Sequence, residues 1–152
     1  MKGRRFTGFI VAAGLFFGAA SGVALAETGT ETVKELALRK IMKDLGANMQ
    51  VITDGISRED WPLIEKTAPL IADHPQPPLT EKMRIIGFMG GDMGRFKGYD
   101  GETHKAAEVL KQVAGTQDGQ EVIAAFQRLQ MTCYGCHHDF RQTFLKHFYP
   151  TR

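Results

Sequence analysis

The sequence has little cysteine: Cys133 and Cys136 are the two cysteines among its 152 residues, and both lie in one short motif. Two cysteines cannot build the dense disulfide framework of a small secreted scaffold. A bridge between residues this close would close a very short loop, which restricts an unfolded chain only slightly. The pair therefore points to a chemical role rather than to a structural disulfide.

Long apolar runs are also scarce, and the clearest one lies near the N-terminus, between Phe6 and Ala20. It follows a positively charged segment, and a short stretch with small residues spaced as Ala-x-Ala ends at Ala26. This layout is typical of a secretory signal peptide, so we expect residues 1–26 to be removed and one exported, periplasmic domain, residues 27–152, to remain. A membrane anchor is the alternative, but the run is short and interrupted for a span of about 20 residues.

The sequence also lacks a large excess of positive or negative charge. The whole chain has a formal net charge of +2. Removal of the signal peptide would take away Lys2, Arg4 and Arg5 and bring the net charge to about −1. No block of basic residues remains in residues 27–152, so nucleic-acid binding has no support.

The mature sequence shows no convincing two-residue alternation of the kind that predicts strands. Apolar residues instead recur at helical spacing, which predicts four helices. We place them at about residues 31–53, 57–71, 103–114 and 119–148, with Ser57 capping the second and a short extra helix over residues 81–88. The prolines after His74 and a glycine-rich passage over residues 87–101 predict a long crossover loop. The expected fold is an all-α, antiparallel four-helix bundle.

The motif Cys133-Tyr134-Gly135-Cys136-His137 has the Cys-x-x-Cys-His spacing of covalent c-type haem attachment. Each thiol can add to one haem vinyl group, and the histidine that follows can bind the iron as the proximal ligand. The helical spacing of apolar residues continues through the motif, so both cysteines are expected on the core face of the last helix. One haem c is the predicted cofactor.

Two other uses of such a pair are less well supported. A thioredoxin-like dithiol sits between a strand and a helix and needs no histidine after it. A zinc site needs four ligands, usually with a second clustered pair. The remaining histidines look scattered along the sequence, without a second pair at ligand spacing: His74, His104, His138 and His147.

Residues 133–141 resemble the class II cytochromes c, the cytochrome c′ family, whose motif is followed by two residues, an aromatic residue and Arg or Lys. Phe140 and Arg141 complete that pattern. The segment from Met42 to Met49 is similar to the family's segment around the distal haem face. The resemblance implies a four-helix bundle, often a dimer, with the haem between its helices.

The sixth iron ligand decides what such a haem does. A methionine closes the iron for electron transfer, whereas an open face binds NO or CO, and the family contains both kinds. In the low-spin, methionine-ligated branch the ligand comes from the first helix, where the resemblance implies Met42, with Met49 as the next candidate. A methionine that only fills the core is the ordinary alternative.

One departure concerns the arginine that the family often places four residues before the distal ligand. Leu38 stands there, and Arg39 is next to it. Arg95 and Arg141 are the other candidates to pair with a haem propionate.

The expected function is one-electron transfer with redox partner proteins, through a haem with His137 and Met42 as ligands. The alternatives are a five-coordinate cytochrome c′ that binds NO or CO, and a bundle without a redox role. No catalytic constellation stands out, so we do not expect an enzyme.

Overall fold

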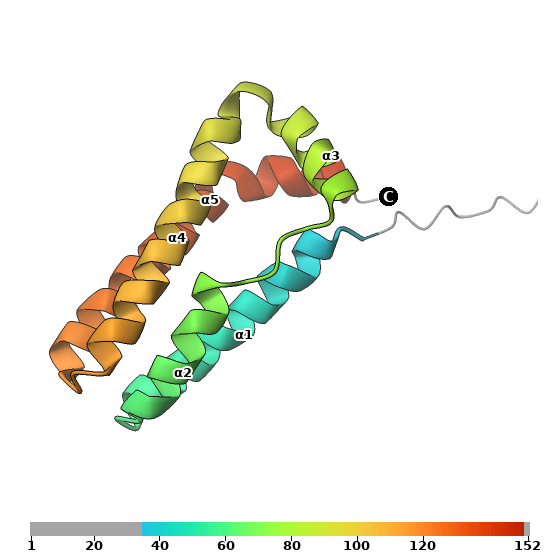
Figure 1. Ribbon diagram of the computed structural model, residues 1–152. Coiled ribbons are helices and arrows are strands. Elements are labelled where there is room, and N and C mark those ends of the chain that lie inside the picture. The colour runs from blue at the N-terminus through green and yellow to red at the C-terminus, as the bar shows by residue number, and fades with distance from the viewer. Residues whose placement is uncertain (1–34, 151–152) are drawn as a thin grey trace, which may run out of the picture. The chain divides into compact units, whose positions relative to one another are not determined.

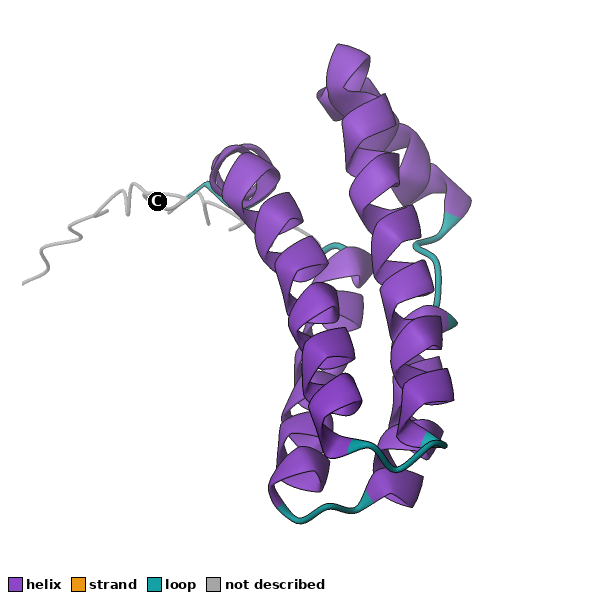
Figure 2. Ribbon diagram, turned by 90° about the vertical axis from the view of Figure 1, so that its left-hand side faces the viewer, coloured by secondary structure: helices purple, strands orange, loops and turns teal. Residues whose placement is uncertain are grey.

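The computed structural model describes residues 35–150, and these residues are helical apart from short connections (Figures 1 and 2). The elements are α1 (Ala37–Ser57), α2 (Trp61–Ala72), α3 (Leu79–Met89), the 3₁₀ helix η1 (Gly90–Asp92), α4 (Met93–Ala114) and α5 (Gly119–Phe148). The four long helices confirm the predicted all-α bundle. The predicted signal peptide and its cleavage point lie outside the described residues. Within residues 35–150, no helix is both long enough and apolar enough to cross a membrane.

Three helix pairs form the body of the bundle, because α1 packs on α2, α2 on α4, and α4 on α5. Their apolar stripes meet in what we call the main core. Its fully buried centre consists of Ile52, Ile64, Ala68, Ala107, Leu110, Val122 and Leu129. Interdigitated aliphatic side chains of this kind supply most of the stability of such a bundle, since helix propensity alone is weak.

The turn between α1 and α2 differs from the sequence prediction. Ser57 is the last residue of α1, and its hydroxyl donates to the carbonyl of Thr53 at 2.9 Å. Asp60 is the actual cap of α2 and accepts a hydrogen bond from the backbone N–H of Leu63 at 3.1 Å. The prediction that Ser57 caps α2 was wrong. Proline is favoured in the first turn of a helix, so Pro62 places the start of α2 at Trp61 and its cap at Asp60.

The glycine-rich passage is mostly helical, so its prediction as part of a loop was wrong. Residues 74–78 are the extended part of the crossover, and α4 begins ten residues earlier than expected, at Met93. Each glycine costs a helix about 1 kcal/mol. Tertiary packing offsets this cost, because Phe96 and Tyr99 stack edge-on against Phe140 of α5, with ring centroids 5.7 and 6.2 Å apart.

A second apolar cluster, which we call the aromatic core, joins the start of α1, α3, the start of α4 and the end of α5. Its buried members are Leu36, Ile85, Met89, Phe140 and Phe148. Phe88 of α3 packs edge-on against Phe144 and Phe148, with centroids 5.9 and 5.2 Å apart, and α3 lies beside the end of α5 in Figure 1.

The N-terminus of α1 is capped by a residue from another helix. The carboxylate of Glu81, on α3, accepts hydrogen bonds from the backbone N–H groups of Ala37 at 2.7 Å and Leu38 at 2.8 Å. The hydroxyl of Tyr149 accepts from the N–H of Leu36 at 3.0 Å. These bonds satisfy N–H groups that have no partner within the helix.

Replacing Glu81 by alanine should therefore lower the free energy of unfolding by about 1–3 kcal/mol, because two partly buried N–H groups lose a charged acceptor. Urea unfolding followed by circular dichroism measures this change. Glu65, exposed on α2, is the matched control, and its replacement by alanine should change stability by less than about 0.5 kcal/mol. Equal effects of the two substitutions would contradict the capping role.

Candidate functional site

The predicted attachment residues lie on the long helix α5. Asp118 caps this helix by accepting from the N–H groups of Gln120 and Glu121 at 3.0 and 3.1 Å. A buried stripe then runs along α5 to Leu129 and reappears at Phe140. Both cysteines are free, half-buried thiols within this stripe, and His137 next to them is exposed.

The two thiols lie where one core gives way to the other. Cys133 packs against the main core, and Cys136 packs against the aromatic core. Residues three apart on a helix share a face, so both sulfurs are presented along one side of α5. The two thiols therefore lie on one face of α5, and each contacts a different apolar cluster.

On α1, Leu38 packs against the aromatic core and Leu45 packs against the main core, so the boundary between the two cores lies between these residues. Met42 lies within this interval and is 38% exposed, whereas Ile41 is the buried residue of that turn. Met49 is half-buried against the main core. Met42 thus lies on α1 between the residues that contact the two cores, as the motif does on α5, but Met42 itself is packed into neither core. Its role as an iron ligand stays a prediction.

Burial dominates the acidity of the two thiols. It raises the pKa of Cys133, and it raises the pKa of Cys136 to about 11 with a further contribution from the negative charge of Asp100. Reactive dithiols of the thioredoxin type have a lowered pKa instead. Since residues 35–150 also contain no strand, the thioredoxin-like alternative loses its support.

The surroundings of His137 favour the neutral form of its imidazole. Partial desolvation of the ring lowers the pKa of His137, and the positive charge of Arg141 lowers it further. Neutral imidazole is the ligand form of histidine, because the coordinating nitrogen must carry a free electron pair.

Residues of α4 hold α5 in place just after the motif. Tyr99 donates from its hydroxyl to Asp139 at 2.8 Å, and the guanidinium of Arg95 binds the same carboxylate oxygen at 2.5 Å. The hydrogen bond from Tyr99 is the main reason that the pKa of Asp139 is lowered. Arg95 also lies over the ring of Phe140, 5.4 Å from its centroid. Arg95 thus already pairs with Asp139, and Arg39 pairs with Glu35.

Gly135, between the two cysteines, allows α4 to approach α5 closely. A Cβ atom at this position would lie 2.6 Å from Cε1 of Tyr99, which is closer than such atoms approach. The aromatic ring would have to move, and its hydrogen bond to Asp139 would be strained.

Replacing Gly135 by alanine should lower the free energy of unfolding by about 1–3 kcal/mol, the usual cost of overpacking. Gly98, on α4, is the matched control, because a Cβ there meets no atom within 4 Å. Alanine at Gly98 should stabilise the protein by up to about 1 kcal/mol through helix propensity. Urea unfolding of both variants distinguishes the two signs, and stabilisation by both would contradict the close approach.

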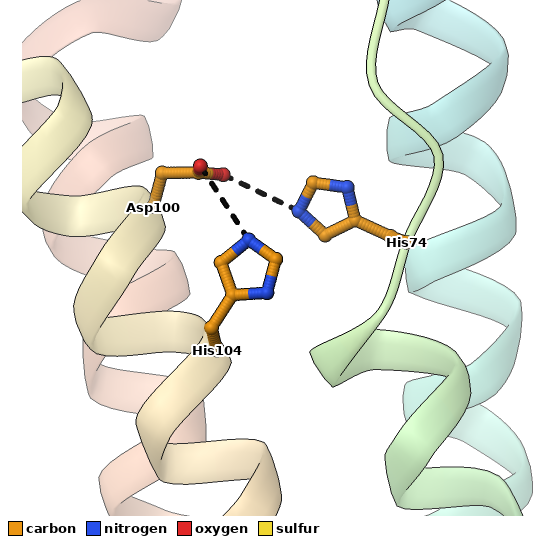
Figure 3. Close-up of side chains that lie close together, drawn as sticks. All are labelled: His74, Asp100 and His104. Carbon is orange, nitrogen blue, oxygen red and sulfur yellow. Dashed lines mark ion pairs between the residues drawn. The ribbon is translucent and has the colours of Figure 1, made fainter.

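The prediction that the other histidines are scattered was wrong for two of them. His74, Asp100 and His104 converge in the structure, with one possible ligand atom from each residue and all three atoms within 4.8 Å of one another (Figure 3). Thirty residues separate the histidines in sequence, and the packing of α2 on α4 brings them together. The spacing of Asp100 and His104, one helical turn apart, was the signal available in the sequence.

This group does not include the motif. In the part of the chain that the structure describes, Cys133, Cys136 and His137 are not gathered with further carboxylates or histidines into a group of potential metal ligands. A zinc site at the motif therefore gains no support from the structure.

The comparison with protein families bears on the same region. Residues 91–141 match the family model described as cytochrome C′, and the match spans all of α4 and the whole Cys-x-x-Cys-His motif. No curated protein matches the chain. The matched residues make up about a third of the chain, and the family to which they are similar implies a haem cofactor.

Proposed function

We propose that the chain is an exported one-electron carrier with one covalently bound haem. In this proposal Cys133 and Cys136 form the two thioethers, His137 is the proximal iron ligand and Met42 is the distal ligand. The observation that carries it is the Cys-x-x-Cys-His motif within the family match, placed on α5 between the two cores.

The residues present fit a covalently held haem. Two free thiols share one helix face, and an imidazole with a lowered pKa follows directly. The main core packs against Cys133 and the aromatic core packs against Cys136, which leaves both thiols partly buried. When bound, haem iron supplies a reversible change between its ferric and ferrous states.

The chain's own residues have a positioning role in this function. The bonds from Tyr99 and Arg95 to Asp139 fix the turn of α5 that follows the iron ligand. With a haem bound, this fixed turn would limit the movement of the His137 imidazole. Such a site transfers electrons without chemical change in the protein, so we propose a carrier rather than an enzyme.

The second candidate is a five-coordinate cytochrome c′ that binds NO or CO. The observation that favours it is the position of Met42, which is 38% exposed and packed into neither core. If its thioether does not bind the iron, the distal face stays open to a small gas molecule.

The remaining parts of the proposal concern the surroundings of the protein. We propose a periplasmic location after signal cleavage, with redox proteins of an exported electron-transfer chain as partners. A homodimer is the association that the family resemblance suggests. Analytical ultracentrifugation of the mature protein tests the dimer.

The test of the proposed function is the absorption spectrum of the mature protein, produced with a c-type maturation system. We expect low-spin iron in both oxidation states, a near-infrared methionine-to-iron band in the ferric state and reversible one-electron reduction. High-spin, five-coordinate spectra in both states, with rapid CO binding to the ferrous protein, would contradict the carrier and support the gas-binding alternative.

A further inference from the structure

A compact group of three side chains lies outside the Cys-x-x-Cys-His motif. His74 belongs to the extended stretch after α2, and Asp100 and His104 belong to α4 (Figure 3). Nε2 of His74 lies 3.3 Å from Oδ1 of Asp100, and Nε2 of His104 lies 3.5 Å from Oδ2. The side chain of His74 is only 6% exposed.

The other ring nitrogens of the two histidines fix their tautomers. Nδ1 of His74 contacts the carbonyl oxygen of Pro75 at 3.1 Å, and Nδ1 of His104 contacts the carbonyl oxygen of Ala72. A carbonyl only accepts, so each Nδ1 must carry a hydrogen and donate it. In the neutral form of each ring, Nε2 then has a free electron pair, and this pair faces the carboxylate.

Three electron-rich atoms facing one another are unfavourable unless positive charge lies between them. The two rings are stacked with centroids 4.7 Å apart, which brings their Nε2 atoms to the same carboxylate. A divalent cation bound to both Nε2 atoms and to the carboxylate removes the repulsion without charging either ring.

The distances agree with this interpretation. Ligands bound tetrahedrally to zinc at 2.0–2.1 Å are separated from one another by about 3.3–3.4 Å. The nitrogen-to-oxygen distances are 3.3 Å to Oδ1 and 3.5 Å to Oδ2, and one ligand atom from each residue lies within 4.8 Å of the others. Binding of one ion would therefore draw the three ligand atoms together by up to about 1.5 Å. The backbone carbonyls that accept from Nδ1 are the usual outer partners of metal-binding histidines.

We propose that His74, Asp100 and His104 form a binding site for a divalent transition-metal ion of the zinc class. Imidazole and carboxylate ligands suit such ions, and three protein ligands leave a coordination position for water. The ion would link the stretch after α2 to α4. The three ligands are distinct from Cys133, Cys136 and His137, although the negative charge of Asp100 also acts on Cys136.

Calorimetric titration of the mature holoprotein with Zn²⁺ tests this site, with Mg²⁺ as the ion control. We expect one Zn²⁺ per chain and no comparable Mg²⁺ binding. His74→Gln, Asp100→Asn and His104→Gln should each weaken Zn²⁺ binding by about 100-fold or more, since even changes in outer partners cost 10–100-fold. His147→Gln, which changes a histidine elsewhere on the surface, should leave the binding unchanged.

Thermal unfolding gives a second readout that does not depend on the variants having the same starting stability. Excess Zn²⁺ should raise the Tm of the unsubstituted protein and of His147→Gln, but not that of His104→Gln, because a ligand stabilises only a state that binds it. No Zn²⁺ binding, or equal binding by His74→Gln and His104→Gln, would overturn the site. Altered haem spectra in those variants, without Zn²⁺ binding, would also overturn it and assign the histidines to the haem.

Discussion

Replacing both Cys133 and Cys136 by alanine should give a mature chain that retains no haem after denaturation. The thioethers are the bonds that survive denaturation, and each requires one of these sulfurs. The expected loss of covalent haem is complete, whereas either single substitution leaves one possible bond. Haem staining after denaturing electrophoresis measures the result.

The fold of this double variant can be checked separately, because alanine is a strong helix former and α5 has its own cap at Asp118. Met131, exposed on the same helix, is the matched control, and its replacement by alanine should leave haem staining unchanged. Haem that remains covalently bound to the helical double variant would exclude the cysteines as its attachment points.

Replacing Met42 by alanine has the second largest expected effect. If Met42 is the distal ligand, nearly all of the iron should change from low spin to five-coordinate high spin, and the midpoint potential should fall, since methionine ligation raises it. CO should then bind rapidly to the ferrous variant. Because Met42 is 38% exposed, its loss should change the stability of the protein moiety by only about 0.5 kcal/mol.

Met49→Ala is the control that separates ligation from packing. Met49 is half-buried against the main core, so this variant should lose about 2 kcal/mol of stability and keep its low-spin spectrum. The reverse pattern, a changed spectrum in Met49→Ala alone, would make Met49 the distal ligand. Unchanged spectra in both variants would remove methionine of α1 from the proposal.

The fold was largely predictable because its information is local. The apolar spacing over residues 119–148 indicated one helix, and α5 spans the same residues. The glycine-rich passage was predicted wrongly as a loop because glycine has a low helix propensity. The packing of Phe96 and Tyr99 on Phe140 stabilises the helix there despite this low propensity. That packing depends on residues about 40 positions later in the sequence.

The functional residues likewise include some that the sequence predicts and some that it does not. The motif from Cys133 to His137 is readable because its residues are adjacent, but the group of His74, Asp100 and His104 depends on the packing of two elements. The cap that Glu81 provides for α1 was also not readable, because no spacing rule connects residues 43 and 44 positions apart. Long-range contacts between side chains are what the sequence alone did not supply.

The most direct test of the account is mass spectrometry of the mature protein under denaturing conditions, followed by tryptic mapping. We predict the mass of residues 27–152 plus one haem, with the haem on the peptide of residues 129–141, which contains both cysteines. A haem-free mass, with both thiols of that peptide open to alkylation, would contradict covalent attachment at Cys133 and Cys136.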